Sequence, residues 1–302
     1  MPKKLNFKAK VVLQGGLGNQ LFQWAFALSI SEFYDEIHLV PNFKNHATQR
    51  VNMVNDLINT NETNLSFGKM TRLQSLRLKI GRRVEFFPWN FFRVFTDDNY
   101  RLGKNKLPFF RSDIFDGYWQ DIKYFNQTND LIFDSLDKFL EKRQCCNLDT
   151  IEHQGDFLVM HVRGTDYLAS NVNRNVYGIL HPEYFGQIIR KHSSLDVMVT
   201  TDDLQYAKMV ASQFTVERFI VQEDLDEWCT LKFIARGKIF IASNSSFSWW
   251  CSFYSLNKGS VVYIPNPWFK DPESPRNLKI GDMLEEVSIW NSDLPSSIEE
   301  LS

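Results

Sequence analysis

The chain has 302 residues, of which 43% are hydrophobic and 15% aromatic, so it can bury one or two sizeable cores. Its 34 basic and 36 acidic residues give a net charge of −2, which does not favour nucleic acid as a partner. The sequence lacks a signal peptide, a stretch of transmembrane length and a C-x-x-C pair, which predicts a cytoplasmic protein with reduced cysteines and no zinc site (Cys145, Cys146, Cys229 and Cys251).

The chain opens on a β-α-β pattern, and its second half repeats strands and helices regularly. Residues 42–130 hold no clear pattern, and the polar stretch 131–156 suits a helix and a connection. Strands of about six residues that alternate with helices of about eleven are typical of a parallel, doubly wound sheet. We expect strands over 10–14, 36–40, 157–163, 196–201, 217–222, 238–243 and 260–264, and helices over 19–33, 181–192, 203–213, 226–236 and 247–257.

This pattern predicts an α/β fold with two Rossmann-like domains that face a cleft. The polar stretch before the second series of strands places the boundary between residues 1–150 and 151–302. The C-terminal tail follows the last regular strand and can return to the first domain.

A glycine turn, Gly15-Gly-Leu-Gly18, joins the first strand to the first helix. It is not a dinucleotide-binding loop, because Leu21 occupies the third glycine position and no acidic residue follows the second strand. Such a turn lets the backbone approach another group closely, and the helix N-terminus that follows carries a partial positive charge. Asn19 and Gln20 offer amide groups at this point. A plain helix-packing turn is the alternative.

The segment 157–167 delivers His161, Arg163 and Asp166 to the end of an apolar strand. Open α/β sheets hold their ligands at the carboxyl ends of strands. Arginine pairs two donors with two phosphate oxygens and keeps its charge. This group of side chains therefore predicts an anionic ligand with a polar ring, such as a nucleoside diphosphate.

A second polar cluster, Ser243-Asn-Ser-Ser-Phe-Ser-Trp-Trp250, lies between a strand and a helix. One of its hydroxyls can cap the helix, and the surplus hydroxyls and backbone N–H groups can form a phosphate cradle. Asp202 and Asp203 follow another strand and either cap the next helix or line the ligand site.

Two further segments have a functional and a structural interpretation. Asp224-Leu-Asp226 has the spacing of a metal-diphosphate site, although acids in the first turn of a helix are the explanation that we favour. In residues 69–95, six cations over 69–83 are followed by the aromatic stretch 86–95, which suits peripheral contact with the inner face of a membrane. A helix that covers the first domain through Leu73, Leu76 and Ile80 is the alternative that we favour.

Four blocks resemble, in order and spacing, the α-1,2-fucosyltransferases of glycosyltransferase family 11. They are Gly-Gly-Leu-Gly-Asn-Gln-Leu-Phe-Gln (15–23), Gly-Tyr-Trp-Gln-Asp-Ile-Lys-Tyr-Phe (117–125), His-Val-Arg-Gly-Thr-Asp-Tyr (161–167) and Ser-Asn-Ser-Ser-Phe-Ser-Trp-Trp (243–250). The resemblance implies a GT-B architecture, GDP-β-L-fucose held mainly by the C-terminal domain, an oligosaccharide acceptor that can be lipid-linked, no cofactor or metal, and inversion to an α-linkage.

The resemblance also implies site residues. Arg163 falls on the arginine that contacts the β-phosphate, His161 on the residue at the guanine-ribose end, and Asp166 on the acid of the same motif. We expect Arg163 and Asp166 to be catalytic, with Asp166 either accepting the acceptor's proton or orienting Arg163. The donor-binding residues that we expect besides His161 are Gly16, Gly18, Asn19, Asp203, Asn244, Ser245, Ser246 and Phe247.

One departure from the family pattern is Gly164, which stands where most relatives carry a second arginine. Two other functions stay open. A metal-dependent nucleotide-sugar transferase would use Asp224 and Asp226, and a non-catalytic carbohydrate-binding protein would use exposed aromatic side chains. Sensitivity to EDTA distinguishes the first alternative, and stabilisation by GDP distinguishes the second.

Overall fold

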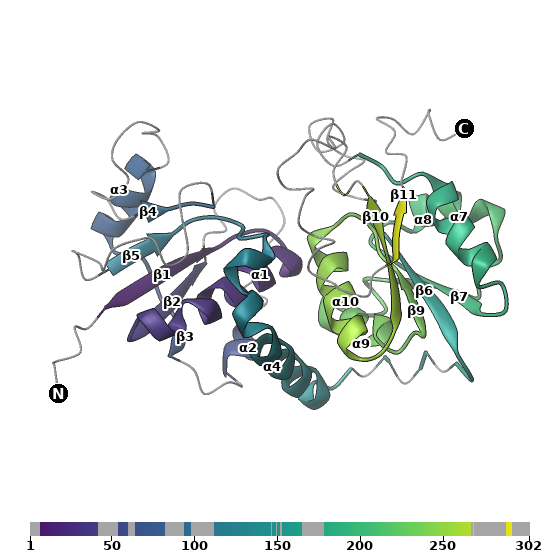
Figure 1. Ribbon diagram of the computed structural model, residues 1–302, viewed down its shortest axis with the longest axis horizontal. Helices are drawn as coiled ribbons and strands as arrows, with labels where there is room; N and C mark the ends of the chain where they lie inside the picture. Colours follow the sequence, from purple (N-terminus) through teal and green to yellow (C-terminus); the bar gives the residue numbers. More distant parts are fainter. Residues whose placement is uncertain are drawn as a thin grey trace. The chain divides into compact units, whose positions relative to one another are not determined.

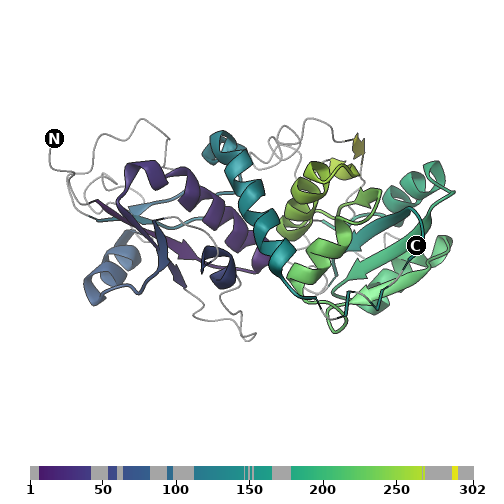
Figure 2. The ribbon, with the colours of Figure 1, turned by 90° about the horizontal axis from the view of Figure 1, so that it is seen from below.

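The computed structural model describes residues 7–41, 54–59, 64–81, 94–97, 112–145, 147, 148, 150, 151, 153–164, 178–266, 268 and 288–291. The chain divides into two compact units, residues 1–141 and 142–302, each built on its own sheet (Figures 1 and 2). Among the described residues, no helix is long and apolar enough to cross a membrane.

Unit 1 contains a parallel five-stranded sheet in the order β3-β2-β1-β5-β4. The central strand β1 leads into the long helix α1, and its neighbour β2 matches the strand expected over 36–40. The strands are β1 (Lys8–Leu13), β2 (Glu36–Pro41), β3 (Leu65–Phe67), β4 (Val94–Phe95) and β5 (Ser112–Phe115), and the helices are α1 (Leu17–Ser29), α2 (Asn55–Asn59), α3 (Arg72–Gly81) and α4 (Asn129–Lys142). Short 3-10 turns cover Ser31–Phe33, Ile122–Tyr124 and Asn126–Thr128.

Helices α1 and α3 cover opposite faces of the unit 1 sheet. Phe26 of α1 packs against Phe115 of β5, with 5.2 Å between the ring centroids. Leu78 of α3 packs on the other face, in a cluster with Val12 and Ile114. Because successive strand residues point to opposite faces, neighbouring residues 114 and 115 contact different helices.

Helix α3 packs on the sheet through a different face from the one expected. Leu78 is buried, whereas Leu73 and Leu76 are 68% and 53% exposed. The interpretation of Leu73, Leu76 and Ile80 as the covering face is therefore wrong. Three apolar residues at helical spacing looked like a core stripe, but the single leucine on the opposite side makes the core contact.

Unit 2 contains a parallel six-stranded sheet in the order β11-β10-β9-β6-β7-β8. From β8, this is the doubly wound order 3-2-1-4-5-6. The elements are β6 (Phe157–Val162), α7 (Pro182–Lys191), β7 (Asp196–Thr201), α8 (Leu204–Val210), a 3-10 turn (Ala211–Gln213), β8 (Arg218–Val221), α9 (Glu227–Ile234), β9 (Ile239–Ile241), α10 (Ser246–Asn257), β10 (Val261–Asn266) and β11 (Ser288–Asn291). The two parallel α/β units confirm the predicted fold class.

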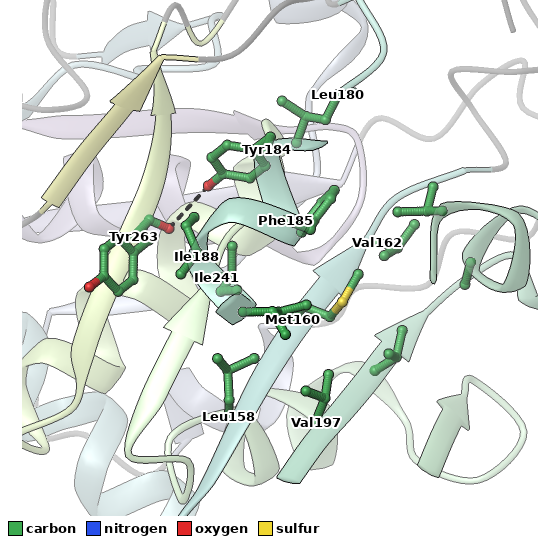
Figure 3. Close-up of a cluster of buried hydrophobic side chains, with 14 of the residues drawn as sticks. Leu158, Met160, Val162, Leu180, Tyr184, Phe185, Ile188, Val197, Ile241 and Tyr263 are labelled. Carbon is green, nitrogen blue, oxygen red and sulfur yellow. Dashed lines mark hydrogen bonds between the residues drawn. The ribbon is translucent and has the colours of Figure 1, made fainter. Parts of the chain in front are cut away.

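The two faces of strand β6 contact different helices of unit 2. Leu158, Met160 and Val162 point into the cluster formed with α7 and α8, which Figure 3 shows. Tyr184 of α7 closes this cluster, and its hydroxyl donates to the backbone oxygen of Tyr263 at 3.4 Å, the dashed line of Figure 3. The alternate residue Phe157 stacks on Phe233 of α9, so the other face of β6 is directed to α9 and α10.

A disulfide joins Cys145 to Cys229 of α9. The expectation of reduced cysteines is therefore wrong for this pair, because the chain that enters unit 2 passes over α9 and brings together thiols 84 residues apart. Two polar contacts hold the same segment: Arg143 pairs with Asp226 at 2.6 Å, and the Asn147 amide donates to the Asp224 carbonyl at 2.9 Å. Cys251 is free and buried.

Candidate active site

The strand order of unit 2 places a candidate site at the carboxyl ends of β6 and β9. The chain leaves β6 toward β7 on one side and reaches β9 on the other, so the two neighbouring strands form a topological switch point. Open α/β sheets bind ligands at such points. A hollow opens here, and its lining includes Val162, Arg163, Ile179, Leu180, Phe185, Tyr206, Ser243 and Asn244.

Arg163 follows β6 directly and is held by Asp202, which follows the neighbouring strand β7. The Arg163 Nη1 and Asp202 Oδ2 atoms lie 3.1 Å apart. The other carboxylate oxygen accepts the Gly164 N–H at 2.8 Å. Asp202 is nearly buried and Arg163 is partly exposed, so the carboxylate orients the cation beside the hollow that Arg163 helps to line.

His161 lies on the α9/α10 face of β6 and is buried among hydroxyl groups. Its Nδ1 is 2.5 Å from Ser248 Oγ and 3.3 Å from Ser243 Oγ. Burial lowers the pKa of His161, the Asp202 charge raises it and the Arg163 charge lowers it, so that the pKa falls from 6.5 to about 4. The imidazole is therefore neutral near neutral pH. Its ring meets the Phe247 ring edge to face, at 5.4 Å between centroids.

The serine-rich turn connects β9 to the N-terminus of α10. Ser245 caps this helix, since its hydroxyl accepts the Ser248 N–H at 3.1 Å. Ser246 and Phe247 are the first two helical residues, and their N–H groups donate to no other group in the described part of the chain. Asn244 is buried beside them and lines the hollow. Unused donors at a helix N-terminus attract anions.

The two aspartates that follow β7 have different roles in the structure. Asp203, expected to bind the donor, caps α8 by accepting the Tyr206 N–H at 3.0 Å. Asp202 orients Arg163, and Asp166, which was expected to be a base or to orient Arg163, lies outside the described residues. Tyr206 was missed as a lining residue. Only the strand order, which sets β7 beside β6, could have indicated it.

In unit 1, the glycine turn joins the end of β1 to the start of α1. Gly15 has φ +80°, and a Cβ there would lie 2.3 Å from Asn19 Nδ2, so only glycine fits. Helix α1 begins at Leu17, two residues before the expected start, so Gly18 and Asn19 lie in its first turn and Gly16 is its N-cap.

Two buried glutamines tie this turn to its surroundings. Gln23 accepts the Gln14 N–H at 2.9 Å and donates to the Gly117 carbonyl at 3.1 Å, which links the ends of β1 and β5. Gln20 donates to the Gly15 carbonyl at 3.0 Å. The first two sequence blocks therefore meet in space, and part of their pattern supports the turn.

The second block also contains a backbone feature. Trp119 has φ 57°, an uncommon left-handed conformation for a tryptophan, and is fully buried. Its ring stacks on Phe26 of α1 with 3.9 Å between centroids. The Asp97 carboxylate accepts the Tyr118 and Trp119 N–H groups, each at 3.0 Å, which holds the turn in place.

The D-x-D segment has a structural role in unit 2. Asp226 caps α9 by accepting the Cys229 N–H at 2.8 Å and pairs with Arg143. Asp224 accepts the Val221 N–H at 3.0 Å. In the part of the chain that the structure describes, His, Cys, Asp and Glu side chains form no group of three or more that could hold a metal.

The chain thus has two parallel α/β units, and unit 2 carries a cation and helix-start N–H donors at its topological switch point. The family comparison specifies the class: the chain belongs to glycosyltransferase family 11, whose model matches residues 1–280. This confirms the family resemblance, and the protein is a glycosyltransferase.

Curated relatives are similar over most of the chain. An "Alpha-1,2-colitosyltransferase" of Escherichia coli is 24% identical over 280 residues, covering 86% of this chain and 92% of that protein. The "O-antigen biosynthesis glycosyltransferase WbnK" of Escherichia coli is 22% identical, covering 85% and 93%. Among solved structures, the α-1,6-fucosyltransferase NodZ soaked with GDP-fucose is 13% identical, with a TM-score of 0.45 over 82% of this chain and 92% of that one.

Proposed function

We propose that the protein transfers L-fucose from GDP-β-L-fucose to a glycan acceptor, with inversion to an α-linkage at the 2-hydroxyl of a galactose. The observation that carries this proposal is the position of Arg163. Asp202 holds it at the end of β6, and it lines the same hollow as Ser243 and Asn244 of the serine-rich turn.

The chemistry explains why such a site suits this reaction. The acceptor oxygen attacks the anomeric carbon of fucose while the bond from that carbon to the β-phosphate oxygen breaks. The electron pair of that bond leaves with GDP, which gains a negative charge. Arg163 and the N–H groups of Ser246 and Phe247 are preorganised to receive this charge. The acceptor's proton passes to a base, for which Asp166 is the candidate from the sequence.

His161 and Phe247 are proposed to receive the nucleoside end of the donor. The neutral imidazole offers hydrogen-bonding capacity without repelling Arg163. If Nδ1 accepts the Ser248 hydroxyl, the ring proton is on Nε2, which then acts as a donor. Gly16, Gly18 and Asn19 of unit 1 remain proposed donor contacts.

Colitose is a second candidate for the transferred sugar, because one relative bears the name of a colitosyltransferase. The acceptor that we propose is a surface-glycan repeat such as an O-antigen unit, since another relative is named for O-antigen biosynthesis. No metal is assigned to the reaction in this proposal, because Asp224 and Asp226 already satisfy backbone N–H groups and, for Asp226, a cation.

Substitution of Arg163 tests the proposal directly. Arg163→Ala should lower the transfer of fucose from GDP-fucose by at least about 10²-fold, because it removes a donor to the leaving phosphate. Arg163→Lys keeps a charge beside Asp202 and protects the fold, but it loses the forked geometry and should also be slow. Arg190→Ala is the matched control, since Arg190 pairs with Glu183 on the surface of the same unit.

Donor specificity is measured in the same assay with GDP-fucose, GDP-colitose, GDP-mannose and UDP-sugars. GDP should raise the melting temperature of the wild-type protein and raise it less for Arg163→Ala. Near-wild-type turnover in Arg163→Ala would remove the assignment of this residue. Loss of activity in EDTA would favour a metal-dependent transferase, and binding of glycans without stabilisation by GDP would favour a non-catalytic protein.

A further inference from the structure

Helix α3 exposes two leucines on the side opposite its core contact. Leu78 anchors the helix to the sheet, in contact with Val12, Val94 and Ile114. Leu73 and Leu76, on the opposite side, are among the most exposed large apolar side chains of the described residues. Isolated exposed leucines are common, but two at helical spacing form a small apolar surface that needs a partner.

Cations flank this apolar surface. On a helix of 3.6 residues per turn, Leu73, Leu76 and Ile80 share one side, with Arg72 and Lys79 along one edge and Arg77 along the other. Arg72 and Lys79 are exposed, and so is Lys69 just before the helix. Residues 68–81 contain four cations and no acid. All charged side chains that this segment contributes to the face are therefore positive.

We infer that this α3 face, defined as Leu73, Leu76 and Ile80 with Lys69, Arg72, Arg77 and Lys79, docks on an anionic lipid surface. An apolar stripe between rows of cations is the arrangement that lets a helix lie in a membrane interface, with leucines in the acyl boundary and cations among the phosphates. The inference rests on the proposed function in one respect: a lipid-linked acceptor would be met at that surface.

The location of α3 in unit 1 agrees with such a role. Helix α3 and helix α1 lie on opposite faces of the sheet, because Leu78 and Phe26 contact successive residues of β5. Figure 1 shows α3 beside β4, the edge strand of the unit 1 sheet. A membrane bound at α3 would therefore lie on the side of the unit 1 sheet away from α1.

Co-sedimentation with vesicles tests the inference without any catalytic step. The wild-type protein should bind vesicles of phosphatidylglycerol and phosphatidylcholine, bind pure phosphatidylcholine far less, and dissociate as salt rises. The double variant Leu73→Gln/Leu76→Gln should lower the partition coefficient at least about tenfold, and so should Arg72→Gln/Lys79→Gln.

Helix α4 supplies matched controls outside the α3 face. Leu131 is 46% exposed there, so Leu131→Gln makes the same polar exchange outside the α3 face. Lys138→Gln/Lys142→Gln removes two exposed helical cations in the same way. Both controls should bind vesicles as the wild type does. Equal losses in the controls, or no binding of anionic vesicles by the wild-type protein, would overturn the inference.

Two further readouts separate this inference from its alternatives. If the α3 face binds a second copy of the chain instead, sedimentation without lipid shows a dimer that Leu73→Gln/Leu76→Gln dissociates, and the inference fails. Transfer to a soluble acceptor should be unchanged in the α3 variants. Loss of vesicle binding with intact transfer supports a docking role, whereas failure of the transferase proposal leaves vesicle binding unaffected.

Discussion

Asp202 holds Arg163 from the neighbouring strand: its two carboxylate oxygens bind the guanidinium at 3.1 Å and the Gly164 N–H at 2.8 Å. The cation therefore stands at the end of β6 in one orientation before any ligand arrives. Preorganisation of this kind removes a reorganisation cost from the reaction step.

Asp202 should act on catalysis through Arg163. Asp202→Asn keeps an acceptor for Gly164 but loses the charge, so kcat should fall about tenfold, or about 1.4 kcal/mol, with little change in KM. The double variant Arg163→Ala/Asp202→Asn should be no slower than Arg163→Ala alone. Steady-state kinetics of the four proteins make the comparison, and independent losses that multiply would show that Asp202 acts otherwise.

Gly164 should tolerate a side chain only if Asp203 gives way. A Cβ at residue 164 would lie 2.6 Å from Asp203 Cβ, so Gly164→Ala should cost about 1–3 kcal/mol of unfolding free energy. In an Asp203→Gly background the clash is gone and the helix cap is only slightly weaker, so the same substitution should cost little. Urea unfolding of the four proteins measures both costs. Equal costs in the two backgrounds would show that contact with Asp203 is not what restricts residue 164 to glycine.

His161 should make stability depend on pH. Its native pKa of about 4 lies below the ordinary 6.5, so the folded protein binds fewer protons than the unfolded chain. The stabilising contribution is complete above about pH 6.5 and is lost as pH falls toward about 4. Between about pH 7 and 4, the wild type should lose about 3 kcal/mol more than His161→Asn, measured by urea unfolding. Parallel pH profiles for the two proteins would exclude His161 as the cause.

Gln23 should stabilise unit 1 more than an ordinary polar side chain. Gln23→Ala leaves the Gln14 N–H and the Gly117 carbonyl without their partner, which should cost about 2–4 kcal/mol. Gln120→Ala, which removes one partly buried bond to Asn19, is the control and should cost about 1 kcal/mol. A similar loss of unfolding free energy in both variants would mean that the link between β1 and β5 stabilises unit 1 no more than a single side-chain hydrogen bond.

Helices and strands with a clear hydrophobic period and recognisable turn residues at their ends were predicted well from the sequence. The strands and helices of unit 2 up to β10 lie within a few residues of their expected positions, because apolar runs such as 157–162 alternate with amphipathic helices, whereas β11 was missed. In unit 1, β3, β4 and β5 were missed, since strands of two to four residues carry no readable period.

The site was only partly predictable for a different reason. His161 and Arg163 could be found because they end one strand, but the Asp202 contact depends on which strand lies beside β6. The same limit explains the disulfide, since Cys145 and Cys229 meet only after the chain has crossed α9. Contacts across strands follow from the sheet order, which local sequence does not encode.

The bridge between Cys145 and Cys229 closes a covalent ring that includes β6, β7 and the Arg163–Asp202 pair. The serine-rich turn and α10 lie outside this ring. One side of the site is thus on a tethered part of the polypeptide, with less freedom to gain on denaturation, and the other side is on an untethered part. A thiol reductant would open the ring that holds the first side and leave the second side unchanged. Melting temperatures measured with and without a reductant therefore belong to two covalent forms of the protein.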